Sequence, residues 1–310
     1  MTAVISAAGL TKVYGALRAV DGLDLEVQQA EIFGFLGPNG AGKSTTIRML
    51  MGLCAPSGGT ARVLGLDPLG QVVAVHARTG YLPGELALHP RLTGAQHFDF
   101  AARARRMRDR QFLGEIIERF GIITDRPVRT LSKGNRQKIG IALAFMHRPE
   151  VLILDEPTSG LDPLLQDEFT RLIRETTAEG RTVFLSSHEL DEVQRVADRV
   201  AIIKEGQLLV TDAVEELRKS APRSMEFRFT TAVDPARFAA IDGVHISEAT
   251  GDRIALTLSG PVAPVLRAAA DLDPVDVIAR PADLDELFLT YYRGGTGEPA
   301  LPASEHSHAG

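Results

Sequence analysis

One short segment of the chain has the residue types and the spacing needed to hold a row of phosphates. It follows the pattern G-x-x-x-x-G-K-S and consists of Gly37, Pro38, Asn39, Gly40, Ala41, Gly42, Lys43 and Ser44. Glycines let such a loop curl so that successive backbone N–H groups point at one anion, and the following helix adds the positive end of its dipole. We expect Lys43 to contact the outer phosphates and the Ser44 hydroxyl to bind Mg²⁺. The segment therefore predicts a nucleotide site, and we call it the phosphate cradle.

Two consecutive carboxylates, Asp155 and Glu156, follow a short apolar run over residues 151–154. Such a run is typical of a central parallel strand that is covered on both faces. Because ligands of open α/β sheets bind at the carboxyl ends of strands, we expect both carboxylates beside the cradle. Asp155 is suited to hold Mg²⁺, directly or through water, and Glu156 to polarise an attacking water. A solvated acidic turn is the alternative, and the presence of the cradle argues against it.

The elements predicted around these residues have the order that a phosphate cradle requires. Residues 31–36 predict a strand that enters the loop, and residues 45–50 predict a helix that leaves it. Short alternating strands before residue 30 predict an antiparallel layer over the nucleotide base, whereas residues 85–140 are mostly helical in pattern. A strand hairpin over residues 200–210 closes this core.

Four motifs, in the same order and spacing, resemble those of ATP-binding-cassette (ABC) ATPase subunits. They are the cradle, Leu-Ser-Lys-Gly-Asn-Arg-Gln-Lys at residues 131–138, Leu-Asp-Glu-Pro-Thr-Ser-Gly-Leu-Asp at 154–162 and Ser-Ser-His at 186–188. The Leu-Ser-x-Gly segment separates this family from kinases, GTPases and helicases. Over roughly the first 215 residues, the resemblance implies an α/β P-loop ABC ATPase head with a parallel-sheet core, an antiparallel β layer and a helical subdomain. Such a head binds ATP and Mg²⁺ and hydrolyses ATP.

The resemblance also implies roles for single residues in one subunit. It implies that ATP contacts continue from the cradle to Thr45 and that Tyr14 stacks on adenine. An ordinary half-buried tyrosine is the alternative at Tyr14. His188 matches the switch histidine, which contacts the γ-phosphate and holds the attacking water in place. Glu156 and His188 are therefore the expected catalytic residues.

A site shared between two copies of the ATPase is implied as well. Ser132 and Gly134 match the signature that covers the γ-phosphate bound to the opposite subunit, and Asp162 matches the loop that crosses the dimer interface. A small hydroxyl residue and a glycine at a helix start supply N–H donors to an anion. The resemblance thus implies a second ATPase subunit, most simply in a homodimer, and a separate transmembrane permease subunit.

Two departures from the family pattern affect these sites. The family has a glutamine after the Gly-Tyr-Leu-Pro turn, where it touches Mg²⁺ and relays the nucleotide state to the membrane partner. Here Gly84 takes that place and Glu85 follows, so either Glu85 substitutes or the contact is absent. The signature also carries Lys133 and Asn135 where glycine and glutamine are commonest. Its serine and the glycine Gly134 remain, so we expect the γ-phosphate contact to be kept.

Composition and charge agree with an ATPase subunit that works with a separate membrane protein. The 310 residues, 44% hydrophobic and 24% charged, have an ordinary globular composition, and a net charge of −6 argues against bulk nucleic-acid binding. No apolar run approaches the ~20 residues needed to span a bilayer, and the N-terminal residues lack a basic-then-apolar signal. We therefore expect no nucleic-acid partner and a cytoplasmic protein, peripheral on the inner face of the cell membrane.

The pattern changes after the ATPase head, so we expect three regions: the nucleotide-binding domain over residues 1–220, an accessory α+β domain over 221–293 and a disordered tail over 294–310. The accessory segment reads β-α-β-β-α-β, which is the split arrangement of ferredoxin-like domains. A final helix is expected over residues 284–291, where apolar residues recur at i, i+3, i+4 and i+7.

The function that best fits these features is ATP hydrolysis that powers export of a small molecule through a separate membrane subunit. The Leu-Ser-Lys-Gly variant, the Gly-Tyr-Leu-Pro-Gly-Glu turn and the Leu-Asp-Glu-Leu-Phe-Leu segment at residues 284–289 resemble the bacterial drug and antibiotic export branch. Two alternatives stay open: the ATPase subunit of an importer, and a soluble ABC ATPase that acts on a non-transport partner. The membrane subunit would bind and recognise the transported molecule.

Overall fold

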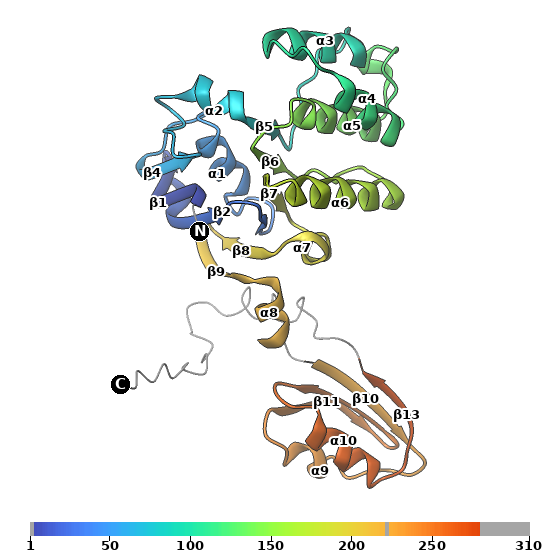
Figure 1. The fold of residues 1–310 in the computed structure, drawn as a ribbon. Helices are drawn as coiled ribbons and strands as arrows, with labels where there is room; N and C mark the ends of the chain where they lie inside the picture. Colours follow the sequence, from blue (N-terminus) through green and yellow to red (C-terminus); the bar gives the residue numbers. More distant parts are fainter. Residues whose placement is uncertain (1–2, 221–222, 280–310) are drawn as a thin grey trace, which may run out of the picture. The chain divides into compact units, whose positions relative to one another are not determined.

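The computed structural model of the chain describes residues 3–220 and 223–279, and it divides into two compact units, Met1–Glu215 and Glu216–Gly310 (Figure 1). The division falls within the short helix α8 (Val214–Ser220). This point lies a few residues before the boundary expected after residue 220. The two units are described separately.

The first unit is built on a six-stranded sheet in the order β5-β6-β7-β3-β8-β9. Its strands are β5 (Thr79–Leu82), β6 (Val151–Asp155), β7 (Thr182–Ser187), β3 (Ile32–Leu36), β8 (Arg199–Lys204) and β9 (Gln207–Ala213). Neighbours from β5 to β8 pair in parallel, and β9 returns antiparallel to β8 as the expected hairpin. Strands β3, β6 and β7 are buried along their whole length, which explains their apolar middles, and the polar residues at the carboxyl ends of β6 and β7 lie at the site edge of the sheet.

A second, three-stranded sheet in the order β2-β1-β4 forms the antiparallel layer. Its strands are β1 (Ala3–Tyr14), β2 (Leu17–Gln28) and β4 (Gly58–Val63). The two long strands form a hairpin, in place of the several short strands expected before residue 30. Helix α1 (Lys43–Leu50) contributes Ile47 to a core cluster. The same cluster includes Val20 of the three-stranded sheet and Phe35 of the six-stranded sheet.

The helices between the two halves of the site are concentrated in residues 85–140, as the sequence predicts. They are α2 (Val72–Arg78), α3 (Gly94–Ala104), α4 (Gln111–Arg119), the 3₁₀ turn Val128–Thr130 and α5 (Lys133–Phe145). Figure 1 shows α3, α4 and α5 together as a green group that extends from the strands. Helix α3 begins with a capping box in which Thr93 and Gln96 satisfy each other's backbone N–H groups. Helices α6 (Pro163–Ala178) and α7 (Leu190–Val196) pack on the parallel sheet.

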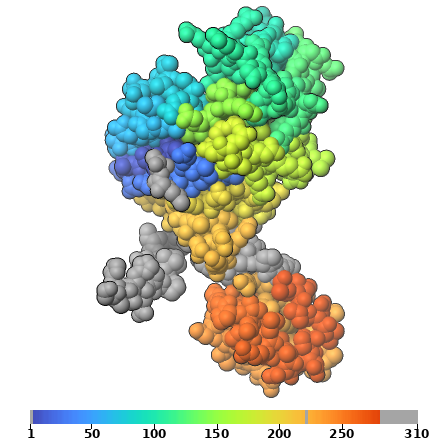
Figure 2. All heavy atoms as spheres, viewed as in Figure 1, coloured from blue at the N-terminus to red at the C-terminus, as the bar shows by residue number. Residues whose placement is uncertain are grey.

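The second unit has the βαββαβ order expected from the sequence. Its elements are β10 (Arg223–Phe229), α9 (Ala236–Ala239), β11 (Val244–Thr250), β12 (Arg253–Leu258), α10 (Ala263–Ala270) and β13 (Pro274–Ala279). All paired strands are antiparallel, in the order β11-β12-β10-β13, which is the ferredoxin-like arrangement. Phe227, Phe229 and Phe238 stack on one another in its core. Figure 2 shows the second unit as a closely packed body, coloured orange to red.

The final helix expected over residues 284–291 and the tail expected over 294–310 lie outside the described residues. Within the part of the chain that the structure describes, every helix is too short or too polar to cross a lipid bilayer.

Candidate active site

The site forms where three neighbouring strands end. Strand β3 leads into the phosphate cradle, β6 ends at Asp155, and β7 lies between them and ends just before His188. Because all three strands run parallel, their carboxyl ends meet at one edge of the sheet. The cradle, the Asp155–Glu156 pair and His188 are thereby brought together from distant parts of the chain.

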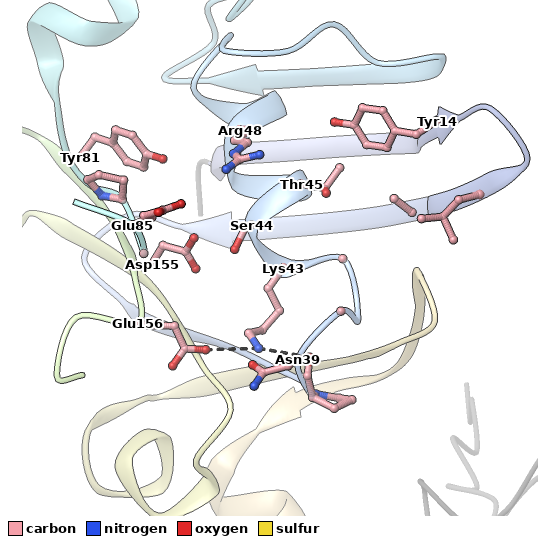
Figure 3. A pocket seen from close by; sticks show the side chains of 17 residues that line it. Tyr14, Asn39, Lys43, Ser44, Thr45, Arg48, Tyr81, Glu85, Asp155 and Glu156 are labelled. Carbon is pink, nitrogen blue, oxygen red and sulfur yellow. Dashed lines mark hydrogen bonds and ion pairs between the residues drawn. The ribbon is translucent and has the colours of Figure 1, made fainter. Parts of the chain in front are cut away.

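A cavity of about 560 Å³ opens at this edge (Figure 3). Ten of the residues expected from the sequence line it: Tyr14, Pro38, Asn39, Gly40, Gly42, Lys43, Ser44, Thr45, Asp155 and Glu156. The two remaining cradle residues lie behind this lining. Gly37 offers its carbonyl oxygen to Lys43, and Ala41 is buried in the core. We call this cavity the nucleotide pocket.

Close backbone contacts explain two of the glycines in the cradle. A side chain at Gly37 would begin 2.4 Å from the carbonyl oxygen of Ile203. Gly42 has φ near +110°, and a side chain there would begin 2.5 Å from the carbonyl oxygen of Ala19. Gly42 is also the N-cap of α1, so no side chain occupies the free N–H groups of the first turn. That helix end is therefore open to an anion.

Lys43 is the buried cation of the pocket, with 6% of its surface exposed. Its Nζ donates to the carbonyl oxygens of Gly37 at 2.6 Å and Pro38 at 3.3 Å. The same atom lies 3.3 Å from Oε1 of Glu156, as the dashed line in Figure 3 marks. A buried ammonium needs such partners because it has lost most of its water. A phosphate in the cradle would offer it stronger ones.

Glu156 is held in place by its backbone as well as by its side chain. Its φ is +51°, a left-handed backbone conformation that residues other than glycine rarely adopt. Its backbone N–H donates to both the carbonyl and the hydroxyl oxygen of Ser186, each at 3.2 Å. The His188 ring donates from Nδ1 to Oε2 of Glu156 at 2.6 Å, and that ring is 45% exposed. The carboxylate thus contacts a buried cation on one side and a solvent-accessible imidazole on the other.

Asp155 is buried, with only 3% of its surface exposed, and its two oxygens have different surroundings. Oδ1 accepts a hydrogen bond from the Ser186 hydroxyl at 2.5 Å, whereas Oδ2 lies toward Gly84. Tyr81 is near enough to respond to this charge: burial raises the pKa of Tyr81, and the negative charge of Asp155 raises it further. Asp155 and the exposed Ser44 hydroxyl offer hard oxygen ligands of the kind that Mg²⁺ prefers.

Tyr14 lies at the far end of the pocket, where β1 ends (Figure 3). Its ring is 46% exposed, and Nζ of Lys12 lies 5.0 Å from the ring centroid. Burial, followed by the neighbouring Cys54 thiol, raises the pKa of Tyr14. An exposed aromatic face that borders the pocket can stack on a base.

Ser132, Gly134 and Asp162 do not line this pocket. Ser132 is the N-cap of α5 and accepts a hydrogen bond from the N–H of Asn135, and Asp162 caps α6 in the same way. A side chain at Gly134 would begin 2.7 Å from the carbonyl oxygen of Gly160. These residues thus lie outside the nucleotide pocket of their own chain.

Sequence reasoning missed several residues that line the pocket. Arg48 follows Ser44 by one helical turn in α1, a spacing that could have revealed it. Leu17 is paired with Tyr14 across the β1–β2 hairpin, which the sequence pattern did not predict. Tyr81 lines the pocket just before the Gly84 turn, and only the pairing of β5 with β6 places it there.

Comparison with known proteins places these features in a family. The family model described as "ABC transporter" matches residues 20–159. The chain is 40% identical over 224 residues to the daunorubicin/doxorubicin resistance ATP-binding protein DrrA of Streptomyces peucetius, covering 71% of this chain and 68% of the relative. It is 38% identical over 233 residues to the bacitracin transport ATP-binding protein BcrA of Bacillus licheniformis, covering 74% and 76%. It is also 35% identical over 303 residues to the daunorubicin resistance ATP-binding protein DrrA3 of Streptomyces coeruleorubidus, covering 92% and 94%.

Solved structures resemble the first unit. An ATP-binding subunit of an ABC transporter aligns with a TM-score of 0.66 and 28% identity, over 70% of this chain and 92% of that one. A dimeric ATP-binding cassette in a post-hydrolysis state with ADP and phosphate aligns with a TM-score of 0.63 and 19% identity, over 68% of this chain and 98% of that one. These alignments confirm the α/β fold expected from the sequence.

Proposed function

The chain belongs to the ABC transporter family of ATPases, and from this premise we propose that its pocket hydrolyses MgATP to drive export of a drug-like molecule through a separate membrane subunit. One observation carries the assignment of the hydrolytic residues. Glu156, at the mouth of the cradle, contacts both the phosphate-binding Lys43 and the exposed ring of His188.

The binding part of the proposal rests on the cradle and its surroundings. The open N-terminus of α1 and the Lys43 ammonium would hold the phosphates, and the ring of Tyr14 would face adenine. Mg²⁺ fits the hard oxygens of Ser44 and Asp155, and it would neutralise charge on the phosphates. Within the described residues, no cluster of three histidine, cysteine or acidic side chains could hold a metal unaided. The metal would therefore enter with the nucleotide, whose oxygens complete its coordination.

The hydrolytic part of the proposal follows from competition for Lys43. A triphosphate in the cradle would draw the ammonium away from Glu156, because its several negative charges attract the cation more strongly than one carboxylate does. Oε1 of Glu156 would then be free to accept a proton from a water molecule. The water oxygen forms a bond to the γ-phosphorus, the bond from that phosphorus to the β–γ bridging oxygen breaks, and ADP leaves. His188, held by Oε2 of Glu156, would contact the γ-phosphate and so help to position it.

The second half of the site is proposed to come from a partner subunit. Ser132 and Gly134 lie outside the pocket of their own chain, at the exposed start of α5. We assign them to the γ-phosphate of the opposite subunit in a homodimer, with Asp162 in the loop at the interface. The dimeric cassette with ADP and phosphate supports this arrangement only as a relative in fold.

The direction and cargo of transport are proposed from the relatives. DrrA and DrrA3 are named for daunorubicin resistance and BcrA for bacitracin transport, which favours export of an antibiotic-like compound over import. The membrane path would belong to a separate permease, and the ATPase would bind that permease at the inner face of the cell membrane. Production of the chain together with a candidate permease should lower cellular accumulation of such a compound, and the Glu156→Gln variant should abolish that effect.

Mixing two inactive variants tests the shared site. Lys43→Ala removes the phosphate ligand of one half-site, and Ser132→Arg blocks the signature half. Each variant alone should be inactive, whereas a heterodimer should regain about half of the activity of a wild-type dimer, because one of its two composite sites contains neither change. A 1:1 mixture, in which about half of the dimers are heterodimers, should therefore show roughly a quarter of wild-type activity. A mixture as inactive as its components, with both proteins folded, would count against the shared site.

A further inference from the structure

Glu85 is an exposed carboxylate on the wall of the nucleotide pocket. Figure 3 shows it on the same wall as Asp155, on the side of the pocket away from Tyr14. Within the described part of the chain, its carboxylate has neither a hydrogen bond nor an ion pair. Most other charged side chains that line the pocket have a partner or lie on α1 at the cradle. Glu85 is thus a free negative charge in a cavity built for anions.

The backbone at Gly84 brings Glu85 to this position. A side chain at residue 84 would begin 3.0 Å from Oδ2 of Asp155 and 3.2 Å from its Cγ. Asp155 cannot easily give way, because it is buried and its other oxygen is held by Ser186. A side chain at residue 84 would therefore press against Asp155, and the side chain of the next residue, Glu85, lines the pocket.

The charges around the pocket make a metal-free triphosphate unfavourable. Two cations, Lys43 and Arg48, face three carboxylates, Glu85, Asp155 and Glu156. Without Glu85, positive and negative side chains would balance in number. Bringing a triphosphate beside an unpaired carboxylate costs Coulomb energy, unless a divalent cation lies between the negative groups.

We propose that Glu85 makes nucleotide binding depend on a divalent cation, by repelling metal-free ATP and attracting the cation that accompanies the phosphates. This inference rests on the proposed function and adds a selection step to it. Lys43 and the cradle would bind phosphate with or without metal. The negative charge of Glu85 would make the pocket bind the metal–nucleotide complex more tightly than the metal-free nucleotide.

Calorimetric titration of the full chain with a nonhydrolysable ATP analogue tests the proposal. Affinity is measured at low salt, once with Mg²⁺ and once with EDTA, for wild type, Glu85→Gln and Glu85→Ala. The wild type should prefer the Mg²⁺ buffer, and both variants should reduce that preference roughly tenfold, mainly by tighter binding in EDTA. Glu26→Gln is the matched control, because Glu26 is an exposed residue of β2 that does not line the pocket. Its preference should equal that of the wild type.

A second titration follows the metal itself. With ADP at saturation, Mn²⁺ affinity measured by electron paramagnetic resonance should fall roughly tenfold in Glu85→Gln and remain unchanged in Glu26→Gln. An equal preference for Mg²⁺ in wild type and Glu85→Gln, or an equal loss of affinity in both buffers, would overturn the role of Glu85. A wild-type chain that binds the analogue in neither buffer would overturn the proposed function instead.

Discussion

Glu156 contacts Lys43 and His188 at once, with Oε1 3.3 Å from the lysine Nζ and Oε2 2.6 Å from the histidine Nδ1. The same carboxylate therefore connects Lys43, which would bind phosphate, with His188, which would contact the γ-phosphate. Its left-handed backbone, fastened to Ser186 at the end of β7, holds the carboxylate at this position. Substitution of Glu156 should therefore impair hydrolysis and leave binding in place, whereas substitution of Lys43 should impair binding itself.

Replacing Glu156 with glutamine should slow ATP hydrolysis by about 10²–10⁴-fold, because the amide cannot accept the proton of the attacking water. ATP affinity should change little, since Lys43 keeps its carbonyl partners and gains the phosphate. Phosphate release and equilibrium nucleotide binding measure the two effects separately. Glu189→Gln is the control: its carboxylate is 59% exposed and lies 3.8 Å from the other ring nitrogen of His188. Turnover close to normal in Glu156→Gln would remove Glu156 from this role.

Replacing Lys43 with methionine should weaken ATP binding by about 1.5–3 kcal/mol, which is roughly 10- to 150-fold, because a charged hydrogen bond to phosphate is lost. Methionine keeps much of the buried aliphatic volume, so the fold should persist. The affinity is measured by calorimetry, with Lys133→Met as control. Lys133 bonds to Ser159 and does not line the pocket. Equal ATP affinities in wild type and Lys43→Met would contradict the assignment.

Two glycine-to-alanine changes in helices should have opposite effects on stability. At Gly134 the new methyl would lie 2.7 Å from the carbonyl oxygen of Gly160, so α5 or the loop must shift at a cost of about 1–3 kcal/mol. At Gly114, within α4, no heavy atom lies within 4 Å, so alanine should stabilise the helix by about 0.5–1 kcal/mol. Urea unfolding measures both changes. A stabilised Gly134→Ala protein would show that the contact with Gly160 is not constraining.

His147 should make the ATPase head less stable in acid. Burial, followed by the positive charge of Arg105, lowers the pKa of His147 to about 4 from its usual 6.5, and its Nδ1 is buried without a hydrogen-bond partner among the described residues. Because the unfolded chain binds this proton more readily, the free energy of unfolding should fall as pH drops from 6.5 to 4, by up to about 3 kcal/mol. Urea unfolding of His147→Gln should show a smaller loss over that range. Identical pH slopes for the two proteins would rule out this contribution.

Features that depend on contiguous residues could be predicted from the amino-acid sequence. The cradle could be recognised because one loop and the helix after it provide the whole phosphate site. The buried strands were predicted because a strand covered on both faces is mainly apolar in its middle. In the second unit, the sequence patterns of successive segments predicted all six described strands and helices. Few topologies are compatible with that order of strands and helices. The assignment of Glu156 as a base rested on its position after a predicted strand.

Which side chains contact one another follows from the packing of the folded chain. The contacts of Glu156 with Lys43 and His188 depend on β7 lying between β3 and β6. They also depend on the left-handed backbone of Glu156, which no sequence pattern predicts. The closeness of Gly84 to Asp155 depends likewise on the pairing of β5 with β6. The low pKa of His147 arises from burial by segments distant in the chain. Such contacts are set by strand order and packing across the sheet, and these bring together residues whose separation along the chain carries no periodic signal.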